Sequence, residues 1–62
     1  MLKIIDVQLW DGIWFVYFNR SLCQSDFDND ETLKSIANRR IDWLLITINN
    51  KEHVTYLMLK YA

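Results

Sequence analysis

The stretch IIDVQLWDGIWFVYF (residues 4–18) decides the expected fold, because it places Asp11-Gly12 between two apolar runs. An Asp-Gly pair between β-prone runs is typical of a two-residue type I′ hairpin turn, in which both turn residues need a positive φ. Gly12 is the only glycine in the chain. We therefore expect two antiparallel strands, at about residues 2–10 and 13–19.

This turn also predicts which residues face each other. A two-residue loop places Trp10 opposite Ile13, Leu9 opposite Trp14, Val7 opposite Val16 and Ile5 opposite Phe18. Because side chains alternate between the two sides of a strand, one face is then wholly apolar and a one-residue slip would destroy it. The apolar face comprises Ile5, Val7, Leu9, Trp14, Val16 and Phe18, and the mixed face comprises Ile4, Asp6, Gln8, Trp10, Ile13, Phe15, Tyr17 and Asn19.

Residues 20–40 predict a loop followed by a helix. Residues 20–30 are polar and without periodicity, which indicates a loop. Asp28, Asn29 or Asp30 can cap a helix, and Glu31 completes a loose capping box with Asp28. Apolar and basic side chains then recur at helical spacing, so we expect a helix at about residues 29–40 that carries Leu33, Ile36, Ala37 and Arg40.

The segment after Arg40 allows two interpretations. Ile41, Leu44, Leu45 and Ile48 could continue the helical stripe, whereas the β-branched run LLITI (residues 44–48) favours a strand. The polar turn at residues 49–52 precedes a second β-prone run, so we favour a second hairpin at about 42–49 and 53–60. Its register stays open, because loops of two and three residues predict opposite pairings.

The expected fold is therefore α+β: a small two-layer ββαββ domain spanning residues 1–62. A four-stranded antiparallel sheet would carry one helix packed on one face. The inner face would gain Leu44, Ile46 and Ile48 from the second hairpin and would pack against Leu33, Ile36 and Ala37 of the helix.

Length and charge exclude several classes of protein. The chain has 62 residues, of which 52% are hydrophobic, and its 7 Lys+Arg and 8 Asp+Glu give a net charge of −1. It is too short for two cores, too apolar to be disordered, and not basic as a whole. No run of 18 apolar residues predicts a membrane span, and Asp6 interrupts any signal-peptide pattern. With one cysteine, Cys23, we expect a full-length cytoplasmic protein without a disulfide.

No catalytic or cofactor motif stands out, so we expect no enzyme, no cofactor and no small-molecule substrate. The chain lacks G-x-G-x-x-G, P-loop and H-E-x-x-H patterns, and Ser21, Ser25 and Ser35 lie outside nucleophile motifs. Cys23 and His53 could form a nucleophilic pair only if the fold joined them. They are too few for a zinc site, and a partly buried loop thiol with a surface histidine is the simpler interpretation.

The acidic segment at residues 26–31 begins like a calcium-binding EF-hand loop. Asp26, Asp28 and Asp30 have the spacing of its first three ligands. The likeness ends at the sixth position, which needs glycine and holds Glu31, and at the twelfth, which needs glutamate and holds Ala37. We therefore expect helix capping and a solvated acidic loop rather than a metal site, with an acidic patch for a basic partner as the other interpretation.

The most informative feature for function is aromatic. Five of the nine aromatic residues fall between Trp10 and Phe18, and the predicted register points Trp10, Phe15 and Tyr17, with Ile13 and Ile4, away from the core. If the helix covers only one face, this second face is exposed and marks a protein interface, with another protein or a second copy. The alternative is that residues 20–30 or Tyr61-Ala62 fold across it.

We therefore predict a non-enzymatic protein-binding module that inhibits or modulates a larger protein and acts as a homodimer. Its predicted interface residues are Trp10, Ile13, Phe15 and Tyr17 as apolar anchors and Asp26, Asp28, Asp30 and Glu31 as steering charges. The profile of the chain is similar to that of small regulators encoded by phages and mobile elements, which would act in the host cytoplasm.

A nucleic-acid-binding regulator is the second hypothesis. Arg20, Arg39 and Arg40 could contact phosphate while aromatic side chains on the sheet stack on bases. The excess of acids over bases argues against it, because affinity for nucleic acid comes mostly from neutralised phosphates.

Overall fold

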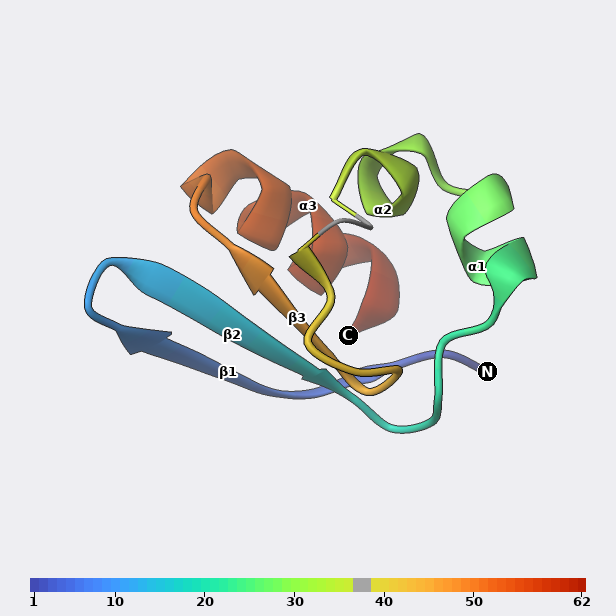
Figure 1. Cartoon of the computed structure of the whole chain (residues 1–62), viewed down its shortest axis with the longest axis horizontal. Helices are drawn as coiled ribbons and strands as arrows, with labels where there is room; N and C mark the ends of the chain where they lie inside the picture. The colour runs from blue at the N-terminus through green and yellow to red at the C-terminus, as the bar shows by residue number, and fades with distance from the viewer. Residues whose placement is uncertain (37–38) are drawn as a thin grey trace.

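The computed structural model describes residues 1–36 and 39–62, which form a three-stranded sheet and three helices. The strands are β1 (Ile4–Trp10), β2 (Ile13–Phe18) and β3 (Leu45–Ile48), antiparallel in the order β1-β2-β3. The helices are α1 (Gln24–Asp28), α2 (Glu31–Ser35) and α3 (Lys51–Tyr61). Figure 1 shows α2 and α3 above the sheet and α1 at its end.

The predicted hairpin turn is confirmed. Asp11 and Gly12 have φ values of 53° and 76°, as a type I′ turn requires. The pairs Trp10–Ile13, Leu9–Trp14 and Val7–Val16 also form as predicted. The turn residues therefore determine the register over the half of the hairpin nearest to them.

Further from the turn, the register prediction is wrong by one residue. Phe18 lies opposite Ile4 rather than Ile5, because the pairing shifts between Ile4 and Asp6. Such a bulge places an extra residue on one strand and reverses the sides taken by the residues beyond it. Consequently Ile4, predicted on the mixed face, packs against the core, whereas Ile5, predicted in the core, is 66% exposed.

The predicted fold class is wrong in its details, although the small α+β character holds. The sheet of the described residues has three strands instead of four, and residues 53–60, predicted as the last strand, lie in helix α3. The Asn50 side chain caps this helix by accepting a hydrogen bond from the Glu52 amide at 2.9 Å. Val54 and Leu57 are buried and Tyr61 packs on the core, so the apolar residues follow the period of a helix.

The single helix predicted at residues 29–40 is also wrong. Residues 24–28, predicted as loop, form α1, and its Phe27 is 3% exposed. α2 ends early with Ile36 as its C-cap, because the chain then returns to the sheet and Arg40 bridges to Ile46 of β3. The predicted packing of Ala37 lies outside the described residues.

The core lies between the sheet and the helices. Leu33, Ile36, Ile46 and Ile48 are buried as predicted, but Leu9 and Leu44 are 56% and 43% exposed, contrary to prediction. Leu9 lies on an edge strand near the hairpin tip, and Leu44 precedes β3, so neither is enclosed on all sides. The buried apolar residues are Leu2, Val16, Phe18, Leu22, Phe27, Leu33, Ile36, Ile46, Ile48, Val54 and Leu57.

We expect Gly12→Ala to lower the free energy of unfolding by about 1–2 kcal/mol, the cost of a left-handed backbone for a residue with a Cβ. A Cβ at Gly12 meets no atom within 4 Å, so the loss reports backbone strain without a steric clash. Thermal unfolding followed by circular dichroism measures it. Asp11→Asn is the control and should leave the melting temperature unchanged, because asparagine also tolerates this conformation. An unchanged melting temperature for Gly12→Ala would contradict the strain.

Candidate protein-interaction surface

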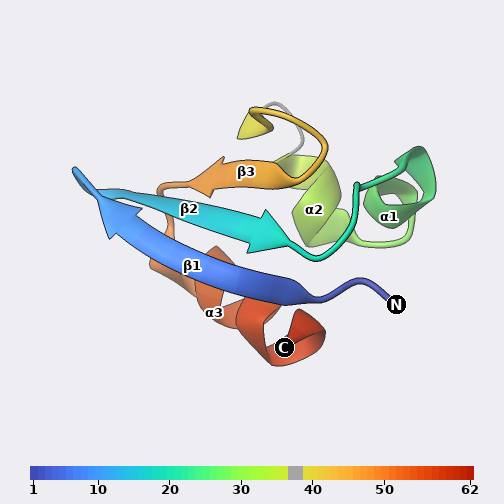
Figure 2. The same cartoon turned by 90° about the horizontal axis from the view of Figure 1, so that it is seen from below.

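The sheet has one face against the helices and one face turned away from them, which we name the outer face. In Figure 2 the sheet lies in front and α3 and α2 lie behind it. Strand alternation and the observed pairing assign to the outer face Asp6, Gln8, Trp10, Ile13, Phe15, Tyr17, Leu45 and Thr47.

The apolar anchors predicted from the sequence all lie on this outer face. Trp10 is 73% exposed and Ile13 is 40% exposed at the hairpin tip. Phe15 and Tyr17 are half-buried because they lie on the central strand, with Gln8 and Thr47 on either side of Phe15. The outer face thus presents an aromatic row bordered by polar side chains.

Intramolecular cover, the alternative considered for this face, is not found among the described residues. The ring of Tyr61 lies edge-on to that of Phe18, with a centroid distance of 6.4 Å, so Tyr61 packs on the core side. Residues 24–28 fold into α1, which Figure 1 shows at the end of the molecule away from the hairpin tip.

The acidic residues predicted to steer a partner lie far from the aromatic anchors. They belong to α1, α2 and the link between them, at the opposite end of the molecule from the hairpin tip (Figure 1). Asp28 and Glu31 are exposed. The structure therefore does not combine the predicted anchors and steering charges into one surface.

Asp26 is engaged in a structural ion pair. Its two carboxylate oxygens each accept a hydrogen bond from the Arg20 guanidinium at 3.0 Å, and one also accepts from the Cys23 amide at 2.8 Å. The hydrogen bonds from Arg20 hold the pKa of Asp26 well below its usual range. The pair joins the end of β2 to the first turn of α1, and it leaves neither charge free for a partner.

Asp30 is a buried capping residue with 3% exposure. One carboxylate oxygen caps α2 by accepting from the amides of Thr32 at 2.9 Å and Leu33 at 3.3 Å. The other accepts from the Tyr61 hydroxyl at 2.6 Å and from the Lys60 ammonium at 3.0 Å. The carboxylate therefore ties the start of α2 to the end of α3.

These contacts shift the pKa values of the cluster. Burial raises the pKa of Asp30, but hydrogen bonds from Tyr61, Lys60 and the Leu33 amide together lower it below the usual value. Burial, followed by the hydrogen bond to Asp30, raises the pKa of Tyr61 to about 12. The hydrogen bond to Asp30 likewise raises the pKa of Lys60. The cluster is therefore most stable with Asp30 and Lys60 charged and Tyr61 neutral.

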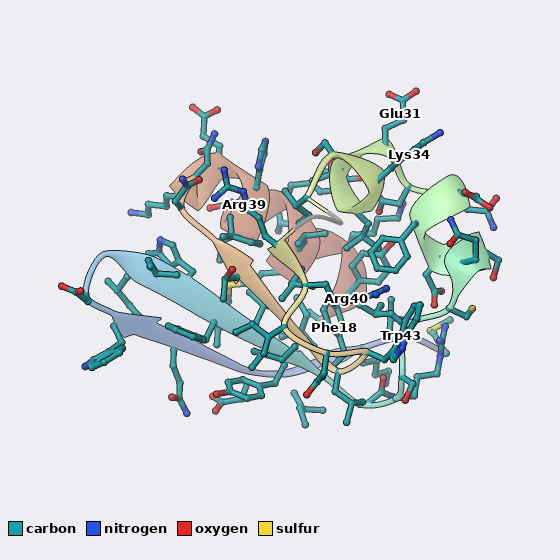
Figure 3. The ribbon with its side chains drawn as sticks, in the orientation of Figure 1. Phe18, Glu31, Lys34, Arg39, Arg40 and Trp43 are labelled. Atoms are coloured by element: carbon teal, nitrogen blue, oxygen red, sulfur yellow. The ribbon has the colours of Figure 1, made fainter. Side chains whose placement is uncertain are left out.

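The arginines of the nucleic-acid hypothesis are in different environments. Arg20 is neutralised by Asp26. The Arg40 guanidinium carbon lies over the Trp43 ring, 3.6 Å from its centroid, whereas Arg39 is exposed. Figure 3 shows Arg40 and Trp43 close together.

A second exposed apolar group, in the loop before β3, was missed by the sequence analysis. Ile41, Trp43 and Leu44 are 59%, 44% and 43% exposed. The Trp43 ring packs edge-on against Phe27 with a centroid distance of 6.5 Å. The residue pattern around Trp43 did not reveal this group, because tryptophan is also common in strands.

Within the part of the chain that the structure describes, no group of three or more His, Cys, Asp and Glu side chains could hold a metal ion. Cys23 is exposed, and its sulfur lies 3.0 Å from the Ser25 hydroxyl. Among the described helices, none has the length and apolar character needed to cross a membrane.

Comparisons with protein-family models, curated proteins and solved structures gave no match for this chain.

We expect Asp30→Ala to lower the free energy of unfolding by about 2–4 kcal/mol, from the lost helix cap together with the lost charged hydrogen bonds. Because the folded pKa of Asp30 is lowered, its contribution is present above the ordinary aspartate pKa and disappears as pH falls below it. Urea unfolding at neutral and acidic pH measures both effects. Asp28→Ala, at an exposed acid, should change stability little. An equal loss in both variants would contradict the structural role of Asp30.

We expect Tyr61→Phe to remove a step in alkaline unfolding. The folded pKa of Tyr61 lies at about 12, above the ordinary tyrosine value, so its contribution is present below the ordinary value. That contribution is lost as pH rises through the folded pKa. Stability curves measured between neutral and strongly alkaline pH should converge for wild type and Tyr61→Phe only at the alkaline end. A constant difference at every pH would contradict this assignment.

Proposed function

We propose that this chain is a non-enzymatic protein-binding module that modulates or inhibits a larger protein through the outer face of its sheet. The observation that carries the proposal is the placement of the described helices on one side of the sheet, which leaves Trp10 73% exposed on the other. Large apolar side chains in solvent are unfavourable, so burial against a partner would stabilise both the module and the complex.

The composition of the outer face supports this role. Trp and Tyr are enriched among residues that dominate binding energy, and Trp10 and Tyr17 provide both types here. Asp6, Gln8 and Thr47 surround the aromatic row with groups that can hydrogen-bond at the rim of an interface. The proposed partner therefore presents a largely apolar surface with polar groups around it.

The ionisable side chains also support a non-enzymatic role. The described groups with the most strongly shifted pKa values, Asp26, Lys60 and Tyr61, are hydrogen-bonded within the structural contacts of the helix layer. The proposed setting is the cytoplasm, where the exposed thiol of Cys23 would stay reduced.

The nucleic-acid hypothesis has less support. It depended on three arginines, and Arg20 is held by Asp26 while the Arg40 guanidinium covers one face of the Trp43 ring. Retention on heparin that falls steeply with salt would support this hypothesis in place of protein binding.

The proposal is tested by binding measurements with Ile13→Lys and Trp10→Ala. A partner captured from cells by the tagged chain is purified, and its affinity for each variant is measured by titration. We expect each variant to weaken binding about tenfold or more, which corresponds to about 1.4 kcal/mol, because each removes an apolar anchor.

Leu59→Lys is the matched control for Ile13→Lys. Leu59 is 82% exposed on α3, in the helix layer behind the sheet. Its substitution should therefore change the affinity by less than about twofold, compared with the roughly tenfold loss expected for Ile13→Lys. Equal capture by wild type and Ile13→Lys would contradict binding through the outer face. Loss of binding in Leu59→Lys alone would place the interface on α3.

A further inference from the structure

The two edges of the sheet differ. The β3 edge is covered by residues 39–41, since Arg40 bridges to Ile46 and the Ile41 amide donates to the Leu45 carbonyl at 3.0 Å. β1 pairs with β2 alone, so its second edge has no strand partner among the described residues. Exposed edges are usually blunted by lysine, proline or bulges. β1 contains neither lysine nor proline, and its bulge at Ile4–Asp6 leaves residues 6–10 regular.

The backbone groups on this free edge can be assigned from the turn. In a two-residue hairpin the residues that flank the turn form a hydrogen-bonded pair, and such pairs alternate along the strands. Trp10 and Gln8 therefore direct their backbone N–H and C=O groups to β2. Val7 and Leu9 direct their backbone N–H and C=O groups outward, where these groups are available to hydrogen-bond to an adjacent strand.

An apolar groove runs beside the same edge. It has a volume of about 360 Å³ and lies between β1 and α3, lined by Ile4, Ile5, Asp6, Val7, Met58 and Ala62. A space of about 150 Å³ already accepts a benzene ring, so the groove has room for a leucine side chain. Close by on the same strand, Leu9 is 56% exposed on the helix-facing side of the sheet. Each chain thus carries both a groove and a side chain suited to fill it.

We propose that two copies of this chain pair through β1 in an antiparallel dimer whose two-fold axis passes between the two Gln8 residues. In this register Val7 of one copy lies opposite Leu9 of the other, and their outward backbone groups hydrogen-bond in both directions. Leu9 of each copy then lies beside Val7 of its partner and enters the groove under Met58. The result is a continuous six-stranded sheet with both sets of helices on one side.

Charge favours a second copy as the occupant, and the area available limits how tightly that copy binds. Asp6 is the single charge on β1, and this register places it opposite Trp10 of the partner, so like charges do not meet. A stable dimer buries about 800 Å² on each partner, roughly a fifth of the 4265 Å² surface of this chain. Five paired residues on each strand bury less surface than that. The groove walls on α3 add to the contact. We therefore expect a dimer that dissociates on dilution.

This inference does not depend on the proposed function. The β1 dimer leaves Ile13, Phe15 and Tyr17 of the outer face free in both copies, so a larger partner can bind the dimer. Ile13→Lys should weaken binding to such a partner without changing the dimer. Leu9→Lys should weaken the dimer without changing the intrinsic affinity of each copy for the partner.

Sedimentation equilibrium over a wide concentration series tests the dimer. Wild type should approach twice the 7.5 kDa mass of one chain at high concentration. Leu9→Lys should weaken the dimer about a hundredfold or more, because a charge enters an apolar groove twice in a symmetric contact. Met58→Lys, which changes the groove from the α3 side, should act in the same direction. Ile41→Lys is the matched control at 59% exposure on the covered β3 side and should dimerise like wild type.

Amide hydrogen exchange distinguishes this dimer from any other. At high concentration the amides of Val7 and Leu9 should exchange at least about tenfold more slowly than in dilute protein or in Leu9→Lys, a protection of about 1.4 kcal/mol. The amides of Gln8 and Trp10, bonded to β2, should be protected at every concentration. A monomer at all concentrations would overturn the proposal. So would a dimer in which Val7 and Leu9 stay unprotected, or one that survives in Leu9→Lys.

Discussion

The buried carboxylate of Asp30 is the contact on which the arrangement of the helix layer depends. It caps α2 and at the same time accepts hydrogen bonds from Lys60 and Tyr61 at the end of α3. A carboxylate removed from water is unfavourable unless its oxygens are paired, so α2 and the end of α3 have to keep their relative positions. In a domain of this size, whose core alone supplies only a few kcal/mol, one such contact is a large part of the total stability.

The functional surfaces follow from this arrangement. With the start of α2 and the end of α3 joined, α3 lies across the three strands and Val54 and Leu57 fill the core from one side. The same layering leaves the outer face uncovered and β1 open at its edge. The two surfaces proposed for binding are thus consequences of a two-layer fold that is too small to cover both sides of its own sheet.

The candidate surface could be predicted only in part. Trp10 and Ile13 are exposed on one face because the turn chemistry determined the register near them. The acidic residues were grouped with them from charge alone, and sequence spacing does not reveal that Asp26 pairs with Arg20 or that Asp30 is buried beside Tyr61. The Arg40–Trp43 stack was missed for the same reason, since it depends on where the chain returns to the sheet.

The sequence by itself determined the β1–β2 hairpin, because Gly12 adopts a positive φ without steric cost, Asp11 tolerates one, and the apolar pattern on either side agrees with the resulting register. It also marked Ile46 and Ile48 as core residues of a strand. Only the tertiary structure decided residues 51–61, since His-Val-Thr-Tyr is compatible with a strand or a helix by local preference. There the burial of Val54 and Leu57 and the hydrogen bonds of Lys60 and Tyr61 to Asp30 favour the helix, in agreement with the local cap at Asn50. The bulge near Ile4 was likewise beyond local chemistry, because it depends on how the core accommodates Ile4 next to Phe18.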